Sequence, residues 1–160
     1  MLKARDTRMA SLSNVIYYIC ENHPDGYNLS IERLIDMLYL IDWRNAIEYK
    51  GQMTNVSWEI RNSKPWMDES SVKELIRFLA NLKNKGLIRT LSRFRSRLSD
   101  SQKRTISFVI QTSLSKDESE LTRLVHSTYP AIAQGLEAQL DFPDLAKEYL
   151  SNIKPLFGKK

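Results

Sequence analysis

The segment from residue 31 to residue 50 constrains the fold most strongly. Its apolar side chains recur at three- and four-residue steps, the period of an α-helix, and form a wide stripe: Ile31, Leu34, Ile35, Met37, Leu38, Leu40 and Ile41. A stripe this wide is typical of a central helix that is covered by neighbours. Asn28 or Ser30 can cap the first amides, and Gly51 ends the helix. We therefore expect the rest of the chain to pack around this segment.

Helix signals also recur on both sides of this segment. An apolar repeat from Met9 to Ile19 predicts a helix that ends at His23-Pro24-Asp25-Gly26. Capping boxes predict helix starts at residues 71–74, 99–102 and 117–120. Tyr129-Pro130 breaks the helix before it, and a last helix is predicted over residues 145–153.

Strand signals are weaker and shorter. We expect a short strand pair around residues 56–60 within an irregular stretch, and a short strand over residues 87–91. The fold class predicted is therefore mainly α, with about five to seven helices and at most a small hairpin or sheet. The 160 residues show neither an internal repeat nor a low-complexity linker, which predicts one domain over residues 1–160.

Residues suited to catalysis or metal binding are scarce. The chain has two histidines, His23 and His126, one cysteine, Cys20, and five glycines. No nucleophile elbow, phosphate loop or dinucleotide fingerprint is present, and the His and Cys spacing does not suit zinc. We therefore predict a non-enzymatic protein without catalytic residues, cofactor or metal. The absence of a long apolar run and of a signal peptide predicts a cytoplasmic location.

Charge points to a macromolecular partner. The formal net charge is +5, and residues 73–104 contain ten basic side chains against Glu74 and Asp100: Lys73, Arg77, Lys83, Lys85, Arg89, Arg93, Arg95, Arg97, Lys103 and Arg104. A helix followed by a basic strand resembles the recognition helix and wing of a winged-helix domain, whose arginines contact phosphates. An acidic protein partner and a merely solvated basic face are the alternatives.

Three tryptophans fall within a short span of the chain. Trp43 lies on the wide apolar helix and is expected in the core. Trp58 and Trp66 lie in the irregular stretch, and tryptophan is enriched at binding hot spots. We therefore predict Trp58 and Trp66, together with Arg61 and Lys64, as partner-binding residues.

Part of this pattern resembles the Panacea domain, the SocA-like antitoxin family that is also met as phage-associated proteins. The resemblance covers about residues 10–132 and rests on two runs. The first comprises Leu38-Tyr39-Leu40, Asp42, Tyr49, Gly51, Thr54 and Trp58, and the second comprises Leu98-Ser99-Asp100 and residues 121–130, which include His126 and Pro130. The chain departs from the family pattern at Lys64-Pro65 and at Ala131. A C-terminal helix and a basic tail, residues 133–160, lie outside the resemblance.

The resemblance implies a protein that neutralises a toxin by direct binding or delivers it to a protease. The expected partner is a toxin or a defence-system protein. The alternatives are an accessory subunit of a nucleic-acid-processing defence complex and a winged-helix-like nucleic-acid binder that uses residues 73–104. Self-association is left open, and no membrane contact is expected.

Overall fold

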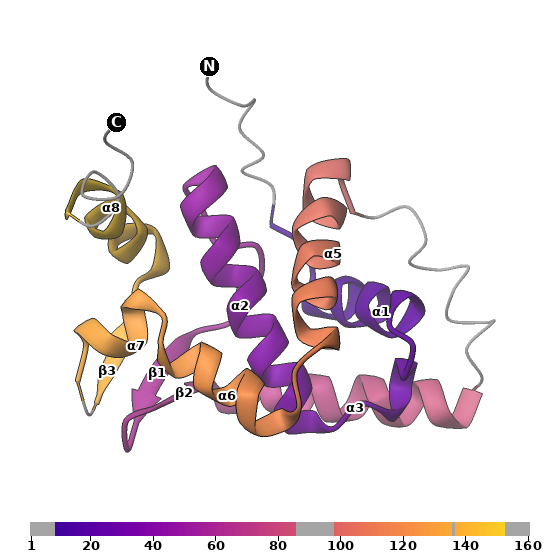
Figure 1. Ribbon diagram of the computed structural model, residues 1–160. Helices are drawn as coiled ribbons and strands as arrows, with labels where there is room; N and C mark the ends of the chain where they lie inside the picture. Colours follow the sequence, from indigo (N-terminus) through magenta and orange to yellow (C-terminus); the bar gives the residue numbers. More distant parts are fainter. Residues whose placement is uncertain (1–8, 86–97, 136, 153–160) are drawn as a thin grey trace.

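The computed structural model describes residues 9–85, 98–135 and 137–152. The order of elements in this part of the chain is α1 (Leu12–Asn22), η1 (Gly26–Asn28), α2 (Ile31–Tyr49), β1 (Trp58–Arg61), β2 (Lys64–Met67), α3 (Glu69–Lys85), α5 (Asp100–Leu114), α6 (Glu118–His126), α7 (Tyr129–Ala133), β3 (Ala138–Leu140) and α8 (Phe142–Asn152) (Figure 1). The prediction of a mainly α fold with a small sheet is confirmed. The strand predicted over residues 87–91 lies outside the described residues.

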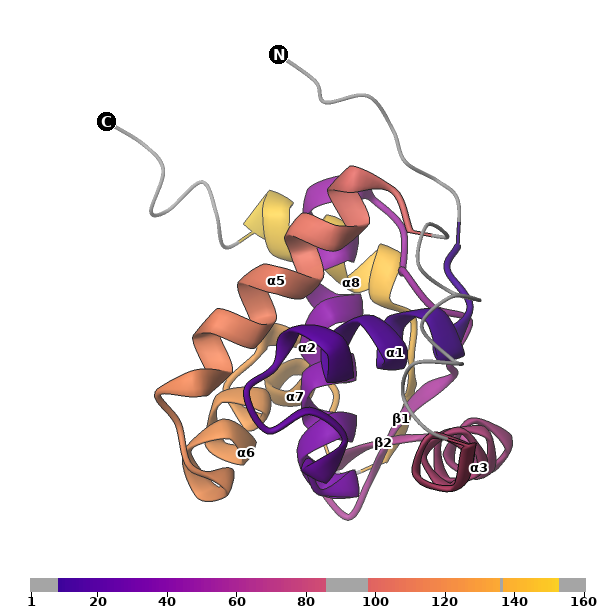
Figure 2. The ribbon, with the colours of Figure 1, turned by 90° about the vertical axis from the view of Figure 1, so that its right-hand side faces the viewer.

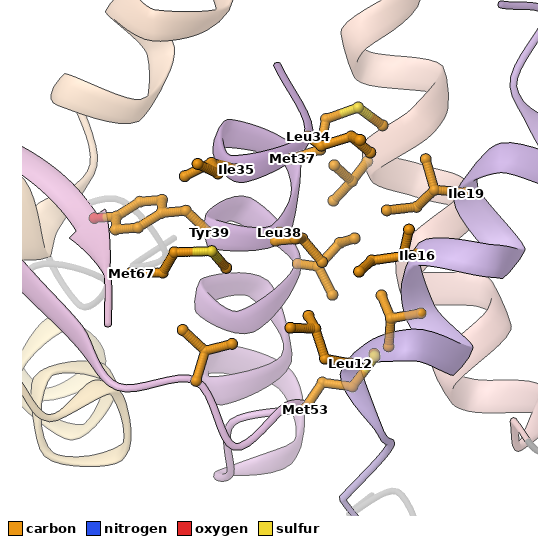
Figure 3. Close-up of a cluster of buried hydrophobic side chains, with 14 of the residues drawn as sticks. Leu12, Ile16, Ile19, Leu34, Ile35, Met37, Leu38, Tyr39, Met53 and Met67 are labelled. Atoms are coloured by element: carbon orange, nitrogen blue, oxygen red, sulfur yellow. The ribbon is translucent and has the colours of Figure 1, made fainter. Parts of the chain in front are cut away.

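Helix α2 is the central element, as its wide apolar stripe predicts. It packs against α5, α6 and α8, while α1 packs against α5 and α3 (Figures 1 and 2). Leu34, Met37, Leu38 and Ile41 of α2 are fully buried. Figure 3 shows that Leu12, Ile16 and Ile19 of α1 extend toward this face of α2. Burial of this stripe is the main source of hydrophobic stabilisation around α2.

Local capping sets most helix starts. Ser30 caps α2 by accepting a hydrogen bond from the Arg33 amide at 3.1 Å. The capping boxes predicted at Ser99 and Asp117 are both present, with Gln102 and Glu120 closing them. In each box, two amides that the helix leaves unpaired gain a side-chain partner.

The capping box predicted at residues 71–74 is wrong. Helix α3 begins at Glu69, and Asp68 accepts hydrogen bonds from the Ser71 amide at 3.1 Å and from the Ser57 amide at 2.9 Å. Burial raises the pKa of Asp68, but these bonds and two from serine hydroxyls outweigh it, so the pKa lies below its usual value. Glu74 instead accepts a hydrogen bond from Ser13 of α1 at 3.4 Å.

A three-stranded antiparallel sheet in the order β2-β1-β3 lies beside the helices. The turn between β1 and β2 places Asn62 and Ser63 at φ values of 52° and 64°. Positive φ at both central residues is the geometry of the tight hairpin turns that match strand twist. The strand pair expected around residues 56–60 therefore falls at residues 58–67, and β3 is an element that the sequence pattern did not indicate.

Arg33 of α2 ties the C-terminal end of α5 to the centre of the fold. Its Nη2 atom donates to the carbonyl oxygens of Ser113 at 2.6 Å and Lys116 at 2.7 Å. Carbonyls at a helix end lack intrahelical donors, and a cation there is also favoured by the helix dipole.

We expect Arg33→Met, which keeps an apolar stem, to lower the free energy of unfolding by about 2 kcal/mol because these carbonyls lose a charged donor. Urea denaturation measures the loss. Arg123→Met is the control, since the guanidinium of Arg123 has one exposed contact, to Ser119 at 3.4 Å, and its loss is expected to cost less than about 0.5 kcal/mol. Equal losses in the two variants would contradict the role of Arg33.

Candidate partner-binding surface

A buried carboxylate fixes the chain that leads into the sheet. Asp42 of α2 is 0% exposed. Its Oδ1 accepts from the Thr54 amide at 2.8 Å, and its Oδ2 accepts from Thr54 Oγ1 at 2.6 Å and from Trp58 Nε1 at 2.8 Å. Burial raises the pKa of Asp42 to about 7, and these hydrogen bonds counteract part of the rise. The Asp42 cluster, meaning Asp42, Thr54 and Trp58, thus anchors β1 to the central helix.

The prediction that Trp58 contacts a partner is wrong. Its side chain is 1% exposed and packs against Tyr39 and Phe142, with ring centroids 5.5 and 6.3 Å away. A buried indole N–H requires an acceptor, and Asp42 supplies one. The burial pattern of β1 alternates, so Trp58 and Ile60 face inward while Arg61 faces solvent. Trp43 lies in the core as expected, at 7% exposed.

The other three predicted residues gather on one face of the sheet. Residues that pair across antiparallel strands share a face, as do alternate residues along a strand. The pairs Arg61↔Lys64, Glu59↔Trp66 and Glu59↔Gln139 therefore define a single outward surface, which we name the outer sheet face: Glu59, Arg61, Lys64, Trp66 and Gln139. The opposite face carries the buried residues Trp58, Ile60, Pro65, Met67 and Leu140.

Short-range interactions order the outer sheet face. Arg61 Nε lies 2.7 Å from Glu59 Oε2, and Gln139 donates to Glu59 Oε1 at 3.1 Å. The Lys64 ammonium lies 5.2 Å from the centroid of the half-buried Trp66 ring, within the range of a cation–π contact. The face thus carries an indole with one cation, Lys64, near its ring. A second cation, Arg61, lies opposite Lys64 and is paired with the Glu59 carboxylate.

The described part of the basic region does not form one continuous surface. Lys73 and Arg77 are exposed on α3, beside Ile76, which is 47% exposed. Lys103 and Arg104 lie on α5, and α1 packs between α3 and α5 (Figure 2). Lys83 and Lys85 belong to α3 with side chains outside the described set, and Arg89, Arg93, Arg95 and Arg97 lie outside the described residues.

Of the side chains suited to nucleophilic or base chemistry, Cys20 and His23 are buried and His126 is exposed. Cys20 is buried, which raises the pKa of its thiol to about 12, so the thiol stays protonated at neutral pH. His23 Nδ1 accepts from the Asp25 amide at 3.0 Å, and burial lowers the pKa of His23. His126 is exposed at the end of α6. Within residues 9–85, 98–135 and 137–152, no three His, Cys, Asp or Glu side chains are grouped to hold a metal ion.

The two runs that carry the family resemblance meet along a seam between α2 and α6. Thr122 Oγ1 donates to Asp36 Oδ2 at 2.9 Å, and Tyr39 Oη lies 2.7 Å from Thr128 Oγ1. Burial raises the pKa of Asp36, while Thr122, Lys64 and His126 oppose the rise. Tyr39 also packs edge-on against Trp58 of the Asp42 cluster. The polar residues of the resemblance therefore include several that hold the scaffold together.

Comparisons with models of protein families, with curated proteins and with solved structures find no match for this chain. Across the helices that are described, none is long and apolar enough to cross a lipid bilayer.

Proposed function

We propose that the chain is a protein-binding module similar in role to a SocA-like antitoxin, and that its outer sheet face contacts an acidic segment of a partner protein. The observation that carries the proposal is the placement of Trp66 on the same outward face as Lys64 and Arg61, with the Lys64 ammonium near its ring and Arg61 opposite Lys64 on the neighbouring strand. Tryptophan and arginine dominate binding hot spots because they bury large areas and form directed polar contacts.

The anchoring of this face supports recognition with little loss of freedom on binding. On the inner side of β1, the Trp58 indole donates a hydrogen bond to Asp42. On the outer side, a salt bridge to Glu59 holds Arg61 in place. A surface whose backbone and side chains are already ordered pays a smaller entropic cost when it binds. The cations favour an acidic partner by steering its approach, an effect that weakens as salt screens charges.

The first experiment is purification of the tagged full chain from its native host, with and without nuclease, followed by mass spectrometry. A stoichiometric protein that survives nuclease supports the proposal, and its toxicity when expressed alone would identify it as a toxin. Loss of every partner on nuclease treatment would contradict it and favour the nucleic-acid alternative.

Variants of the outer sheet face then test the surface itself. We expect Trp66→Ala to weaken binding of the recovered protein by at least about tenfold. The double variant Arg61→Ala/Lys64→Ala should lower the affinity by a larger factor at low salt than at high salt, because salt screens the charges that this variant removes. Calorimetry measures the affinities. Lys147→Ala, an exposed cation on α8, is the control and is expected to bind as the wild type does. Unchanged affinity in all face variants would contradict this surface.

A further inference from the structure

Two adjoining hollows lie between α1 and α5, on a different part of the molecule from the outer sheet face. Their volumes are about 370 and about 590 Å³, and both are lined by Tyr18 and Lys103. Asn14 and Glu21 line the smaller hollow, whereas Arg104 and Phe108 line the larger. Tyr18 Oη lies 3.3 Å from Ser107 Oγ, which joins the two helices at the shared wall. We name the two hollows together the α1–α5 groove.

The smaller hollow is lined by a buried acceptor that lacks a donor. Asn14 is 9% exposed, and its Oδ1 has no hydrogen-bond partner among the described residues. Burial of a carbonyl oxygen without a donor is unfavourable, because the hydrogen bond to water is lost and not replaced. Oδ1 itself has almost no accessible surface, so an N–H group of a ligand in this hollow reaches it once the Asn14 side chain turns toward the hollow.

The larger hollow combines an exposed aromatic ring with cations. Phe108 is 48% exposed, and the Arg44 guanidinium lies 3.6 Å from its ring centroid, which holds the ring in place. Arg104 precedes Phe108 by one helical turn, a separation of about 6 Å along the axis. This is close to the separation between a nucleobase and its phosphate. Aromatic rings beside cations are the combination that binds unpaired nucleotides.

The acidic residues of the groove set the orientation of an anionic ligand. Glu21 lines the smaller hollow but not the larger one, and it repels a phosphate, so the phosphate is directed toward Lys103 and Arg104 in the larger hollow. Asp100 also lines the larger hollow and is exposed, and it weakens the field of these two cations. Its removal should therefore strengthen anion binding.

We propose that the α1–α5 groove binds a nucleotide unit, either a free nucleotide or a residue of a single strand. The Asn14 side chain turns toward the hollow and its Oδ1 accepts from an exocyclic amino group of the base, the base lies against Tyr18, and the phosphate contacts Lys103 and Arg104. Phe108 stacks the neighbouring base when the ligand is a strand. Adenine, guanine and cytosine carry such an amino group, whereas thymine and uracil do not.

Fluorescence anisotropy with the full chain tests the proposal, using labelled dA and dT 12-mers and unlabelled AMP as competitor. We expect dA to bind about tenfold more tightly than dT, because dT leaves the buried acceptor unpaired. Phe108→Ala should weaken dA binding about tenfold and leave AMP binding unchanged if strands are the ligand. The groove would be assigned to free nucleotides if Arg104→Gln lowered the affinities for AMP and dA by similar factors and Phe108→Ala changed neither affinity.

Charge variants separate specific binding from attraction to the basic chain as a whole. We expect Arg104→Gln to reduce the slope of log affinity against log salt by about 1, and Asp100→Asn to raise affinity several-fold. Lys147→Gln on α8 is the matched control and should change neither. No binding at low salt, equal affinity for dA and dT, or binding that all groove variants leave unchanged would overturn the proposal. These outcomes are independent of the outer sheet face, so the two proposals fail separately.

Discussion

Replacement of Asp42 by alanine is expected to lower the free energy of unfolding by about 3 kcal/mol at pH 8, because buried donors lose their shared acceptor. The Thr54 amide, the Thr54 hydroxyl and the Trp58 indole all donate to this carboxylate. These donors have no access to water, since Thr54 is 0% exposed and Trp58 is 1% exposed. Asp42→Asn keeps one acceptor oxygen and should lose less. Urea denaturation followed by tryptophan fluorescence measures the change.

The cost of removing Asp42 should also depend on pH. The pKa of Asp42 is about 7 in the folded protein, against about 3.9 for an unfolded aspartate. Between these values the folded state binds one more proton than the unfolded state, so the contribution of this carboxyl to stability falls as pH rises through 7. The difference between wild type and Asp42→Ala should therefore be larger at pH 5 than at pH 8, by about 2–3 kcal/mol.

A control on the same helix isolates the effect of burial. Glu32 is exposed in the first turn of α2, and Glu32→Gln is expected to cost less than about 1 kcal/mol, mainly through the helix dipole. The gap between wild type and Glu32→Gln should stay nearly constant from pH 5 to pH 8. A gap for Asp42→Ala that narrows toward pH 5 would contradict the raised pKa.

Features set by local sequence could be predicted, and features set by distant contacts could not. The stripe on α2 and the capping boxes at Ser99 and Asp117 depend on neighbours within a few positions, so their signals lie in short windows. Asp68, and not Ser71, caps the start of α3, because Asp68 stands immediately before the helix and accepts a hydrogen bond from the Ser71 amide. Asp68 also accepts a hydrogen bond from the Ser57 amide, which lies on the other side of the hairpin.

In the candidate surfaces too, contacts between residues far apart in the sequence could not be predicted. Trp58 lies in a strand of four residues, too short for alternation to reveal its inward side, and its acceptor Asp42 is 16 positions away. Strand β3 has three residues, and Gln139 meets Glu59 across 80 positions. Tyr18 and Ser107, which join the walls of the α1–α5 groove, are 89 positions apart. Arg61, Lys64 and Trp66 could be proposed because they fall within one hairpin.

Phe142→Ala is expected to lower the free energy of unfolding by about 4 kcal/mol, since it removes a large side chain from a site that cannot collapse fully. Phe142 is 0% exposed, and its ring lies 5.3 Å from that of Tyr39, 5.7 Å from Trp43 and 6.3 Å from Trp58. Two of these rings belong to α2 and one to β1, while Phe142 itself begins α8 immediately after β3. One side chain thus links the last helix to both the central helix and the sheet.

Two variants separate the loss of packing from the loss of an aromatic ring. Phe142→Leu fills much of the space and should cost about 1–2 kcal/mol, while Phe108→Ala removes a ring that is 48% exposed and should cost less than about 1 kcal/mol. Near-ultraviolet circular dichroism at low denaturant should lose intensity in Phe142→Ala, because Trp43 and Trp58 both pack on this ring. A spectrum and stability like those of Phe108→Ala would show that the aromatic contacts of Phe142 do not hold the sheet and α8 against α2. Partner binding to the outer sheet face should weaken with Phe142→Ala if β1 owes its position to this packing.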